Sequence, residues 1–351
     1  MPNSSVCVTV VTFNSAGYIR RCLEAVLAQE GVPLEVVVVD NASQDGTRAI
    51  LAGFAGRIRM ILNACNNGFA EGQNQAIRAA ESEWVLALNP DALLPPRFVK
   101  TLVDAGAADP QAGTVCGKLL SIGPGFQPLP EPRIDSTGIY FTPALRHFDR
   151  GWHEPDDGRF DTTEYVFGAS AAAALYRREM IDDISVSGAF FDPDFFAYRE
   201  DADVAWRAQL LGWRCLYTPA AVAYHVRGVV PGDRRSVAPA VNMHSVKNRF
   251  LMRIKNATPD LYRRFWAPMT ARDLLVLGGI LVAEPRSLGA LWRLAACLPR
   301  IVRNRRIIMS RRVASDEAIA RWFSFAPTAS ALRPAMPEPG LNAGGIAVPT
   351  T

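Results

Sequence analysis

Residues 84–95 read W-V-L-A-L-N-P-D-A-L-L-P, and they decide how the rest of the chain is interpreted. The apolar run at 84–88 is short and bounded, which predicts a buried strand. It ends on Asn89, Pro90 and Asp91, a polar group between two hydrophobic segments. Open α/β sheets bind ligands at the carboxyl ends of their strands, which makes this group a candidate ligand site. The alternative is an ordinary turn, because Asn, Pro and Asp are common turn residues.

Strands, polar loops and helices alternate before this stretch. Strands are expected at 6–11, 34–39 and 58–62, and each is followed by a polar loop and then by a segment that we expect to be helical. This alternation predicts an α/β fold with a doubly wound, mostly parallel sheet. The polar loops then lie along one edge of the sheet, an arrangement that suits a nucleotide.

Glycine motifs that bind phosphate are absent from the sequence. The first loop has no G-x-G-x-x-G, and no G-x-x-x-x-G-K-[ST] occurs anywhere. A phosphate group must therefore be held differently. A divalent cation, Mg²⁺ or Mn²⁺, on Asp91 would neutralise a diphosphate and bridge its oxygens.

Composition indicates a cytoplasmic globular protein. The 351 residues suffice for one large domain or two smaller ones. A net charge of +4 is too small to indicate a nucleic-acid partner. The six cysteines are scattered and form no C-x-x-C motif, as expected in a reducing compartment. The first residues lack the features of a signal peptide, so we expect the protein to act where it is made.

Acidic residues surrounded by aromatic ones occur at 190–203, which reads F-F-D-P-D-F-F-A-Y-R-E-D-A-D. A carboxylate among aromatic side chains loses hydration, which raises its pKa and makes it a better proton acceptor. Asp201 is therefore a candidate general base. The structural alternative is that Asp201 and Asp203 stabilise the first turn of a helix, where the helix dipole favours acids. We assign Asp203 to that structural role.

Four motifs give roughly the first 230 residues a family resemblance. They are V-T-F-N-S at 11–15, V-V-D-N-A-S-Q-D-G-T at 38–47, N-N-G-F-A-E-G-Q-N at 66–74 and L-N-P-D at 88–91. Each motif is weak alone, but their order and spacing are specific. Together they resemble a family 2 glycosyltransferase of the GT-A fold, in particular its bacterial rhamnosyltransferase-like branch.

The resemblance assigns the donor side of the site. It implies that Asp91 is the metal-binding last residue of a D-x-D motif, in which Asn89 replaces the first Asp and weakens the metal site. It also implies that Thr12, Asn14, Asp40 and Asn41 hold the nucleoside. Segment 67–74 would cover the sugar diphosphate. Its candidate residues are Asn67, Gly68, Phe69, Gly72 and Asn74.

The resemblance also assigns residues of the second half. Glu200 and Asp201 match the E-D pair of the family, in which the Asp is the general base, and a W-R...G-W stretch follows at 206–213. Short strands expected at 215–217 and 221–224 lead to His225 and Arg227. GT-A enzymes often place a further metal or phosphate ligand at the position of His225, although an isolated His is usually just a satisfied polar residue. Arg227 is a candidate partner of the diphosphate.

The implied activity is inverting sugar transfer from a nucleotide-diphosphate sugar to a hydroxyl of a glycan or polyprenyl-linked acceptor, in cell-surface polysaccharide synthesis. dTDP-rhamnose is the preferred donor, and a UDP-sugar is the alternative. A nucleotidyltransferase would carry a glycine-rich, basic loop after the first strand, which residues 12–17 do not provide. The other rival is a non-catalytic, membrane-associated protein that binds sugar nucleotide, and only Asn89 supports it.

We expect a GT-A catalytic domain at 1–235, with a donor half at 1–112 and an acceptor half at 113–235. A basic amphipathic helical extension is expected at 236–326. The remaining residues, 327–351, are rich in Pro, Ala and Gly, which predicts a disordered tail.

The helical extension is strongly basic. Residues 243–312 contain fifteen Lys and Arg against three acids. The apolar run at 274–283 has only ten residues, too few to span a bilayer. We therefore expect the extension to lie on the anionic inner face of the cell membrane. The alternatives are a helical subdomain packed on the catalytic domain, or a homodimer contact.

Overall fold

The computed structural model describes residues 4–227, 239–283 and 285–323, so the tail predicted at 327–351 lies outside the described residues. The strands in these ranges are β1 (Val6–Thr12), β2 (Leu34–Asp40), β3 (Arg59–Leu62), β4 (Trp84–Leu88), β5 (Ala92–Leu93), β6 (Ala112–Ser121), β7 (Ile134–Ser136), β8 (Ile139–Phe141), β9 (His147–Asp149), β10 (Glu164–Val166), β11 (Ala173–Arg177) and β12 (Arg214–His225). The helices are α1 (Ile19–Leu27), α2 (Thr47–Ala52), α3 (Gly68–Arg78), α4 (Phe98–Ala107), α5 (Arg178–Ile184), α6 (Glu200–Leu210), α7 (Pro239–Asn256), α8 (Pro259–Ala283), α9 (Gly289–Ser310) and α10 (Asp316–Ala320).

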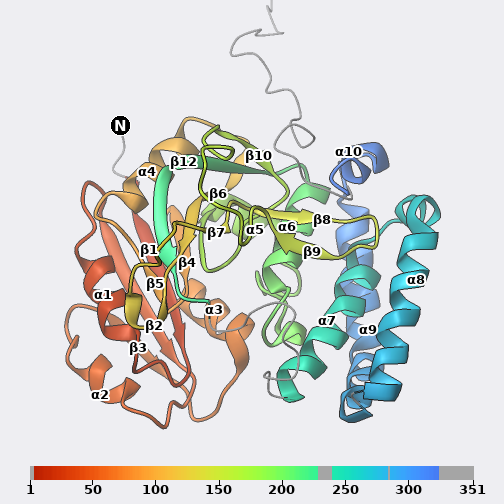
Figure 1. Cartoon of the computed structure of the whole chain (residues 1–351), viewed down its shortest axis with the longest axis horizontal. Coiled ribbons are helices and arrows are strands. Elements are labelled where there is room, and N and C mark those ends of the chain that lie inside the picture. The colour runs from red at the N-terminus through yellow and green to blue at the C-terminus, as the bar shows by residue number, and fades with distance from the viewer. Residues whose placement is uncertain (1–3, 228–238, 284, 324–351) are drawn as a thin grey trace, which may run out of the picture.

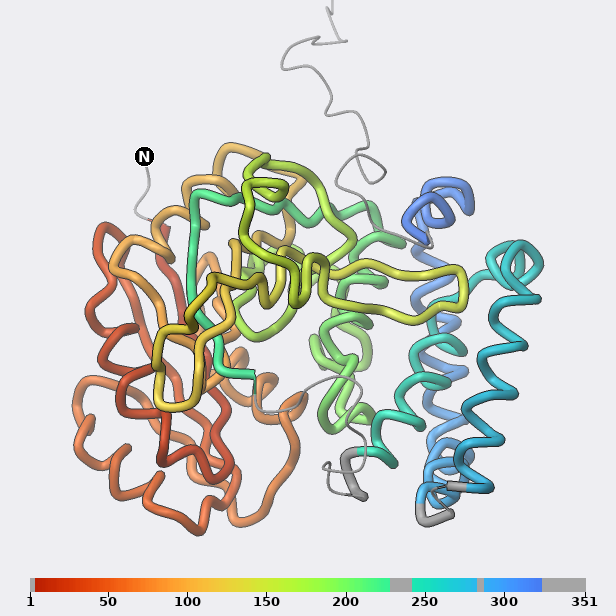
Figure 2. Tube along the Cα trace, viewed as in Figure 1, coloured from red at the N-terminus to blue at the C-terminus, as the bar shows by residue number. Residues whose placement is uncertain are grey.

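One large sheet organises the chain. Its strand order is β10-β12-β6-β11-β4-β1-β2-β3, with β5 paired to β12 and β7 paired to β6, while β8 and β9 form a separate hairpin. Figures 1 and 2 show the sheet on one side of the molecule and helices α7 to α10 gathered on the other. The domain boundaries themselves stay predictions.

The N-terminal half of the sheet is parallel. β3, β2, β1 and β4 form a series of parallel pairs. Val8 and Val10 pack in one cluster with α1 and α2, whereas Val11 packs with residues of α3 in another. Both faces of these strands are therefore covered, which explains why they read as continuous apolar runs. The predicted doubly wound, mostly parallel sheet is confirmed.

Strand β12 differs from the sequence-based expectation. The two short strands predicted at 215–217 and 221–224 are one strand, which pairs with β6 and has an irregular register between Thr218 and Val222. Pro219 lies inside that irregularity and accounts for it, because proline has no N–H to donate to the neighbouring strand. The turn-like residues around Pro219 suggested a break, but the strand continues to His225.

Helix α7 packs charged side chains inward. The Nζ of Lys255 contacts carboxylate oxygens of Asp192 and Asp203, at 2.6 and 2.8 Å. Asp203 also accepts hydrogen bonds from Asn256 Nδ2 at 2.7 Å and from Arg207 Nε at 3.0 Å. Both Lys255 and Asp203 are buried. Asp203 therefore has the structural role expected of it, and it joins the first turns of α6 to the C-terminal helices.

Several other cations of the basic region also bind acids or carbonyl groups of the protein. Arg249 and Arg253 contact Asp273 of α8, at 3.0 and 2.7 Å. Arg300 forms an ion pair with Asp194, and other arginines bind backbone carbonyls. The high count of basic residues therefore reflects packing between helices to a large extent, and much of the charge is compensated before it reaches the surface.

Helix α8 is longer than the apolar run in the sequence suggests. By length and composition alone, Pro259–Val282 is apolar enough to cross a membrane, and 17% of its most apolar window is buried. The run at 274–283 is thus the end of a 25-residue helix rather than an isolated segment. Large apolar side chains are exposed along α8 and at the start of α9. They include Trp266, Leu274, Leu275, Leu281, Val282, Leu288 and Trp292.

Replacing Lys255 with Met should destabilise the protein by about 3–5 kcal/mol, because it removes one partner from a buried network of charges. Urea unfolding measures the loss. Arg263→Ala is the control, since the ion pair of Arg263 with Asp260 is exposed and should contribute no more than about 1 kcal/mol. Equal losses in the two variants would show that the Lys255 network does not hold α7 in place.

Candidate active site

The carboxyl ends of β1 and β2 place two polar side chains side by side. Thr12 lies opposite Asp40 in the parallel register, and its hydroxyl donates to Asp40 Oδ1 at 3.1 Å. Asp40 is fully buried and also accepts from the N–H of Ser43 and the Nε of Arg48. Burial raises the pKa of Asp40, but hydrogen bonds from Ser43, Arg48 and Thr12 lower it by more. Asp40 is therefore an ionised group that fixes this loop.

Asn14 and Asn41 connect the loops that follow the strands. Asn14 has a φ of 53°, in the left-handed region, and its Oδ1 accepts from the N–H of Gln44 at 2.8 Å. The Nδ2 of Asn41 donates to the carbonyl of Gly68 at 3.0 Å. The structure thus brings into one cluster the residues predicted to hold a nucleoside. They are Thr12, Asn14, Asp40 and Asn41.

Helix α3 begins against the segment that precedes α6. Gly68 has a φ of 82°, and a Cβ there would lie 2.5 Å from the carbonyl oxygen of Phe196, so the position requires glycine. The N–H of Ala70 donates to that same carbonyl at 3.1 Å. The side-chain amide of Asn74 exchanges two hydrogen bonds with the backbone of Phe191, at 2.7 and 3.0 Å. These contacts fasten the predicted diphosphate segment to the segment that carries the acidic pair.

Some candidate residues of the diphosphate segment are held in packing contacts, and others are accessible to a ligand. Asn74 is buried and both ends of its amide bind Phe191, so in this structure it is a structural link. Phe69 packs edge-on against the ring of Phe191, with 5.9 Å between centroids. A Cβ at Gly72 would lie 2.8 Å from a valine of β1, which shows how closely α3 approaches the sheet. Asn67, at the start of α3, is partly exposed and remains accessible to a ligand.

Residues far apart in the sequence meet at the tip of β4. The end of β12 pairs with β5, which places His225 opposite Ala92. The Nε2 of His225 consequently lies 3.3 Å from Asp91 Oδ1 and 3.3 Å from Asn89 Nδ2. The N–H of Val226 donates to the carbonyl of Asp91 at 3.0 Å. The two predicted metal ligands, Asp91 and His225, are therefore neighbours.

Sequence reasoning missed Asp135, a fully buried carboxylate behind this cluster. Its Oδ2 accepts from His225 Nδ1 at 2.9 Å, and its Oδ1 accepts from Arg227 Nε at 2.8 Å. Arg227 also contacts Asp149 of β9 at 2.6 Å. Asp135 follows a proline-rich stretch without a recognisable motif, so no pattern in the sequence marked it.

These contacts set the charges of the cluster. Burial raises the pKa of Asp135, but His225 and Arg227 outweigh burial and lower it to about 2. Burial lowers the pKa of His225, whereas hydrogen bonds to Asp135 and Asp91 raise it to about 9. Burial also lowers the pKa of Arg227, but Asp149 and Asp135 raise it overall. At neutral pH, in this structure, both His225 and Arg227 are therefore cations.

The acidic pair begins α6. Asp201 lies in the first turn of α6, as the structural alternative expected, and accepts hydrogen bonds from the N–H of Ala202 at 2.7 Å and from the N–H of Ala171 at 3.4 Å. The neighbouring Glu200 is buried, and its Oε2 has no hydrogen-bond partner among the described residues. An unpaired buried oxygen favours the protonated form of this carboxyl group.

The surroundings of these two acids raise the pKa of both. Burial raises the pKa of Glu200 well above its ordinary value, and the adjacent Asp201 raises it further. Burial also raises the pKa of Asp201, and Asp149 adds to the shift, so that the value is about 6. A pKa of about 6 leaves Asp201 ionised at neutral pH, which suits a general base.

Two consecutive residues link the acidic pair to the tip of β4. The N–H of Ala171 donates to Asp201, while the carbonyl of Ala172 accepts from the N–H of Asn89 at 3.0 Å. A proton acceptor thus lies beside a polar cluster that contains Arg227 and His225. This arrangement can remove a proton from one group while cations stabilise negative charge on another.

The tip of β4 can hold a metal ion only with additional ligands. Within the described ranges, no three His, Cys, Asp or Glu side chains are grouped as a metal site. Asp91 and His225 supply one oxygen and one nitrogen donor. These donors fit Mn²⁺ or Mg²⁺ if phosphate oxygens and water complete the coordination.

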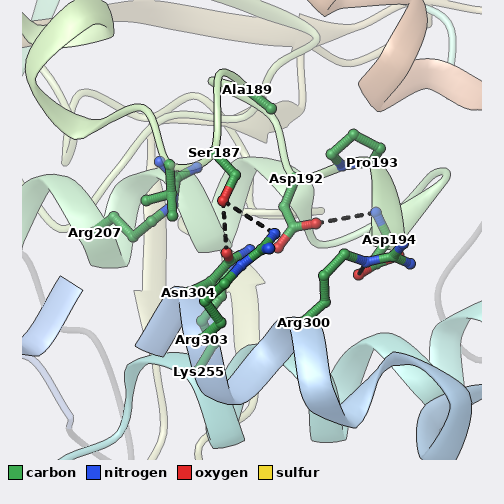
Figure 3. A pocket seen from close by; sticks show the side chains of 11 residues that line it. Ser187, Ala189, Asp192, Pro193, Asp194, Arg207, Lys255, Arg300, Arg303 and Asn304 are labelled. Atoms are coloured by element: carbon green, nitrogen blue, oxygen red, sulfur yellow. Dashed lines mark hydrogen bonds and ion pairs between the residues drawn. The ribbon is translucent and has the colours of Figure 1, made fainter. Parts of the chain in front are cut away.

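A cavity of about 270 Å³ lies elsewhere, between segment 186–194 and α9 (Figure 3). Two of its cations are compensated, because Arg300 pairs with Asp194 and Lys255 pairs with Asp192. None of the predicted site residues lines it. The cavity therefore belongs to the contact between the C-terminal helices and the rest of the protein.

Comparisons of sequence point to one family. A sequence model described as Glycosyl transferase family 2 matches residues 7–185, which include the four N-terminal motifs but end before Glu200. N-acetylglucosaminyl-diphospho-decaprenol L-rhamnosyltransferase of Mycobacterium tuberculosis is 25% identical over an alignment of 250 residues, which covers 62% of this chain and 75% of the relative. Succinoglycan biosynthesis protein ExoO of Rhizobium meliloti is 39% identical over 100 residues, or 28% of this chain and 29% of the relative.

Comparisons of structure confirm the GT-A fold. GalNAc-T7 with UDP, GalNAc and Mn²⁺ superposes with a TM-score of 0.57 at 13% identity, over 72% of this chain and 48% of that chain. The match therefore spans about half the length of GalNAc-T7. Residues 1–349 of S. aureus TarS superpose with a TM-score of 0.52 at 18% identity, over 88% of this chain and 86% of that chain. At these identities the likeness establishes the fold alone.

Proposed function

This chain belongs to glycosyl transferase family 2 and is a glycosyltransferase, and from that premise we propose the reaction that its site performs. A sugar is transferred from a nucleotide-diphosphate donor to a hydroxyl of a glycan or polyprenyl-linked acceptor, with inversion at the anomeric carbon. The observation that carries the proposal is that two consecutive residues, Ala171 and Ala172, bind Asp201 and Asn89 respectively. It puts a carboxylate with a raised pKa beside the tip of β4, where Asp91, His225 and Arg227 converge.

In the proposed reaction, Asp201 accepts the proton of the acceptor hydroxyl as the acceptor oxygen bonds to the anomeric carbon. The bond between that carbon and the diphosphate breaks, and its electron pair leaves with the nucleoside diphosphate. Arg227 stabilises this negative charge as it develops. A divalent cation bound to Asp91 and His225 would add to that stabilisation.

The remaining site residues bind the donor in this proposal. Thr12, Asn14, Asp40 and Asn41 hold the nucleoside. Asn67, Gly68, Phe69 and Gly72 lie at the start of α3, where the positive end of the helix dipole favours an anion such as the diphosphate. Asn74 fixes α3 against the segment that precedes the base. Asn89 is a neutral neighbour of the cation site, and Glu200 lies beside Asp201.

The proposed donor is dTDP-rhamnose, and the proposed acceptor is a lipid-linked sugar for cell-surface polysaccharide. The M. tuberculosis relative supports both, since it is an L-rhamnosyltransferase named for a diphospho-decaprenol-linked sugar. A UDP-sugar is the second candidate, because GalNAc-T7 and TarS were both crystallised with UDP.

Asp201→Asn should reduce transfer by about 100- to 10,000-fold, because it removes the group that accepts the proton. Donor binding should survive. It is measured as thermal stabilisation by a panel of nucleotide sugars, in which dTDP-rhamnose should give the largest shift. Asp157→Asn is the control, since this acid is exposed and pairs only with surface groups. Transfer at the normal rate in the Asp201 variant would exclude Asp201 as the base.

In a plot of kcat/KM against pH, the decrease on the low-pH side (the acid limb) should follow the pKa of Asp201. Transfer should fall as the pH drops below about 6, because protonation removes the base. The negative charge of Asp149 contributes to the raised pKa, so Asp149→Asn should move the limb to lower pH. The measurement is kcat/KM between about pH 4.5 and 8. If the acid limb of Asp149→Asn stays at the same pH or moves to higher pH, Asp149 does not raise the pKa of the base as proposed.

We also propose that the protein binds the inner face of the cell membrane through apolar side chains where α8 leads into α9. Val282 and Trp292 are 87% and 80% exposed, and Leu281 is 65% exposed. Such side chains enter the boundary between headgroups and acyl chains, and the exposed Arg293 beside them favours anionic lipid. The sequence predicted a basic amphipathic segment at the membrane, and the present proposal gives more weight to its apolar side chains, because several of its cations are paired within the protein.

A double variant, Val282→Glu with Trp292→Glu, should lose most of its sedimentation with phosphatidylglycerol vesicles. Stabilisation by nucleotide sugar should be unchanged. The control is Leu62→Glu, which alters an apolar side chain of β3 that is 57% exposed. Removal of all C-terminal helices would not be a clean test, because α7 holds Asp203. Full vesicle binding by the double variant would exclude this surface as the anchor.

A further inference from the structure

We propose that Asp135 is the positioning residue of this site, which orients His225 and Arg227 toward the tip of β4. The inference rests on the proposed function, in which that tip holds the diphosphate of the donor and a divalent cation. Asp135 itself is fully buried, and of the two proposed metal ligands it contacts only His225, at ring nitrogen Nδ1.

The carboxylate of Asp135 determines which nitrogen of His225 faces the tip. A carboxylate only accepts hydrogen bonds, so the ring nitrogen 2.9 Å from Asp135 Oδ2, Nδ1, carries a proton. Nε2 is then the nitrogen directed toward Asp91, 3.3 Å away. Metal-binding histidines usually donate their other ring N–H to a carboxylate or carbonyl in this way, which fixes the ring.

The same carboxylate holds Arg227. Asp135 accepts from Arg227 Nε at 2.8 Å and from Nη2 at 3.3 Å, and Asp149 accepts from the same Nη2 at 2.6 Å. The two acids therefore fix the Nε–Nη2 edge of the guanidinium. One buried group thus controls both the nitrogen donor and the arginine of the diphosphate site.

Asp135 is well placed for this role because its backbone is fixed. It lies in β7, and the residues on either side, Ile134 and Ser136, are aligned with β6. An Asn at 135 would keep the shape, but its amide can donate to Nδ1 and so favours the proton on Nε2. The ring would then present the wrong nitrogen to the cation.

The test measures affinity for dTDP by calorimetry, with Mn²⁺ and with EDTA, at one fixed pH. Asp135→Asn should weaken the Mn²⁺-dependent binding by about 10- to 100-fold. Added to His225→Gln, the same change should lower the Mn²⁺-dependent part of the affinity by less than about 3-fold, because the ring through which it acts is gone, and any loss that comes through Arg227 should be equal with Mn²⁺ and with EDTA. Asp156→Asn is the matched control, an acid of the same region that binds Lys118, and should have no effect.

Ring ¹⁵N NMR of His225 gives a second measurement that does not depend on the metal. At about pH 10, where the metal-free ring is neutral, the wild-type ring should carry its proton on Nδ1, and Asp135→Asn should shift the ring toward the Nε2–H form. If Asp135→Asn does not fold, Asp135→Glu, which displaces the carboxylate, should change the same signals. Unchanged ring signals in the folded variant would overturn the positioning role. Equal dTDP affinity with Mn²⁺ and with EDTA in the wild type would instead refute the proposed metal site, and the NMR result would still decide the role of Asp135.

Discussion

The pairing of β5 with the end of β12 is the contact on which the site depends. It sets His225 opposite Ala92 and so brings it beside Asn89, 136 positions away in the sequence. Without this pairing, Asn89, Pro90 and Asp91 would form only a turn after a buried strand. β12 reaches the tip because its irregular register accommodates Pro219 without ending the strand.

Buried acids support the site from behind. Asp135 binds His225 and Arg227, and Asp203 joins the helix that begins with the acidic pair to Lys255 and Asn256 of α7. The C-terminal helices therefore contribute to the position of the base, in addition to any role at a membrane. Each acid is stabilised by cations held at hydrogen-bond distance, which is how a protein tolerates buried charge.

Sequence predicted the parts of the site that follow from local pattern. Thr12, Asp40 and Asp91 each lie at or just after the end of a strand, and parallel strands bring such positions to one edge. Asp135 and Asp149 could not be predicted, because their roles come from contacts across the fold and their surroundings show no periodic pattern. The count of basic residues also misled, since a count does not reveal that Arg249, Arg253 and Lys255 are bound to buried or partly buried acids.

The most direct test of the account is a crystal structure of the protein with dTDP and Mn²⁺, in which anomalous scattering locates the metal. The account predicts Mn²⁺ between Asp91 and the Nε2 of His225, bound to diphosphate oxygens, with the nucleoside on the loops at Thr12 and Asp40. A nucleotide bound elsewhere, or a metal ion distant from both Asp91 and His225, would contradict it.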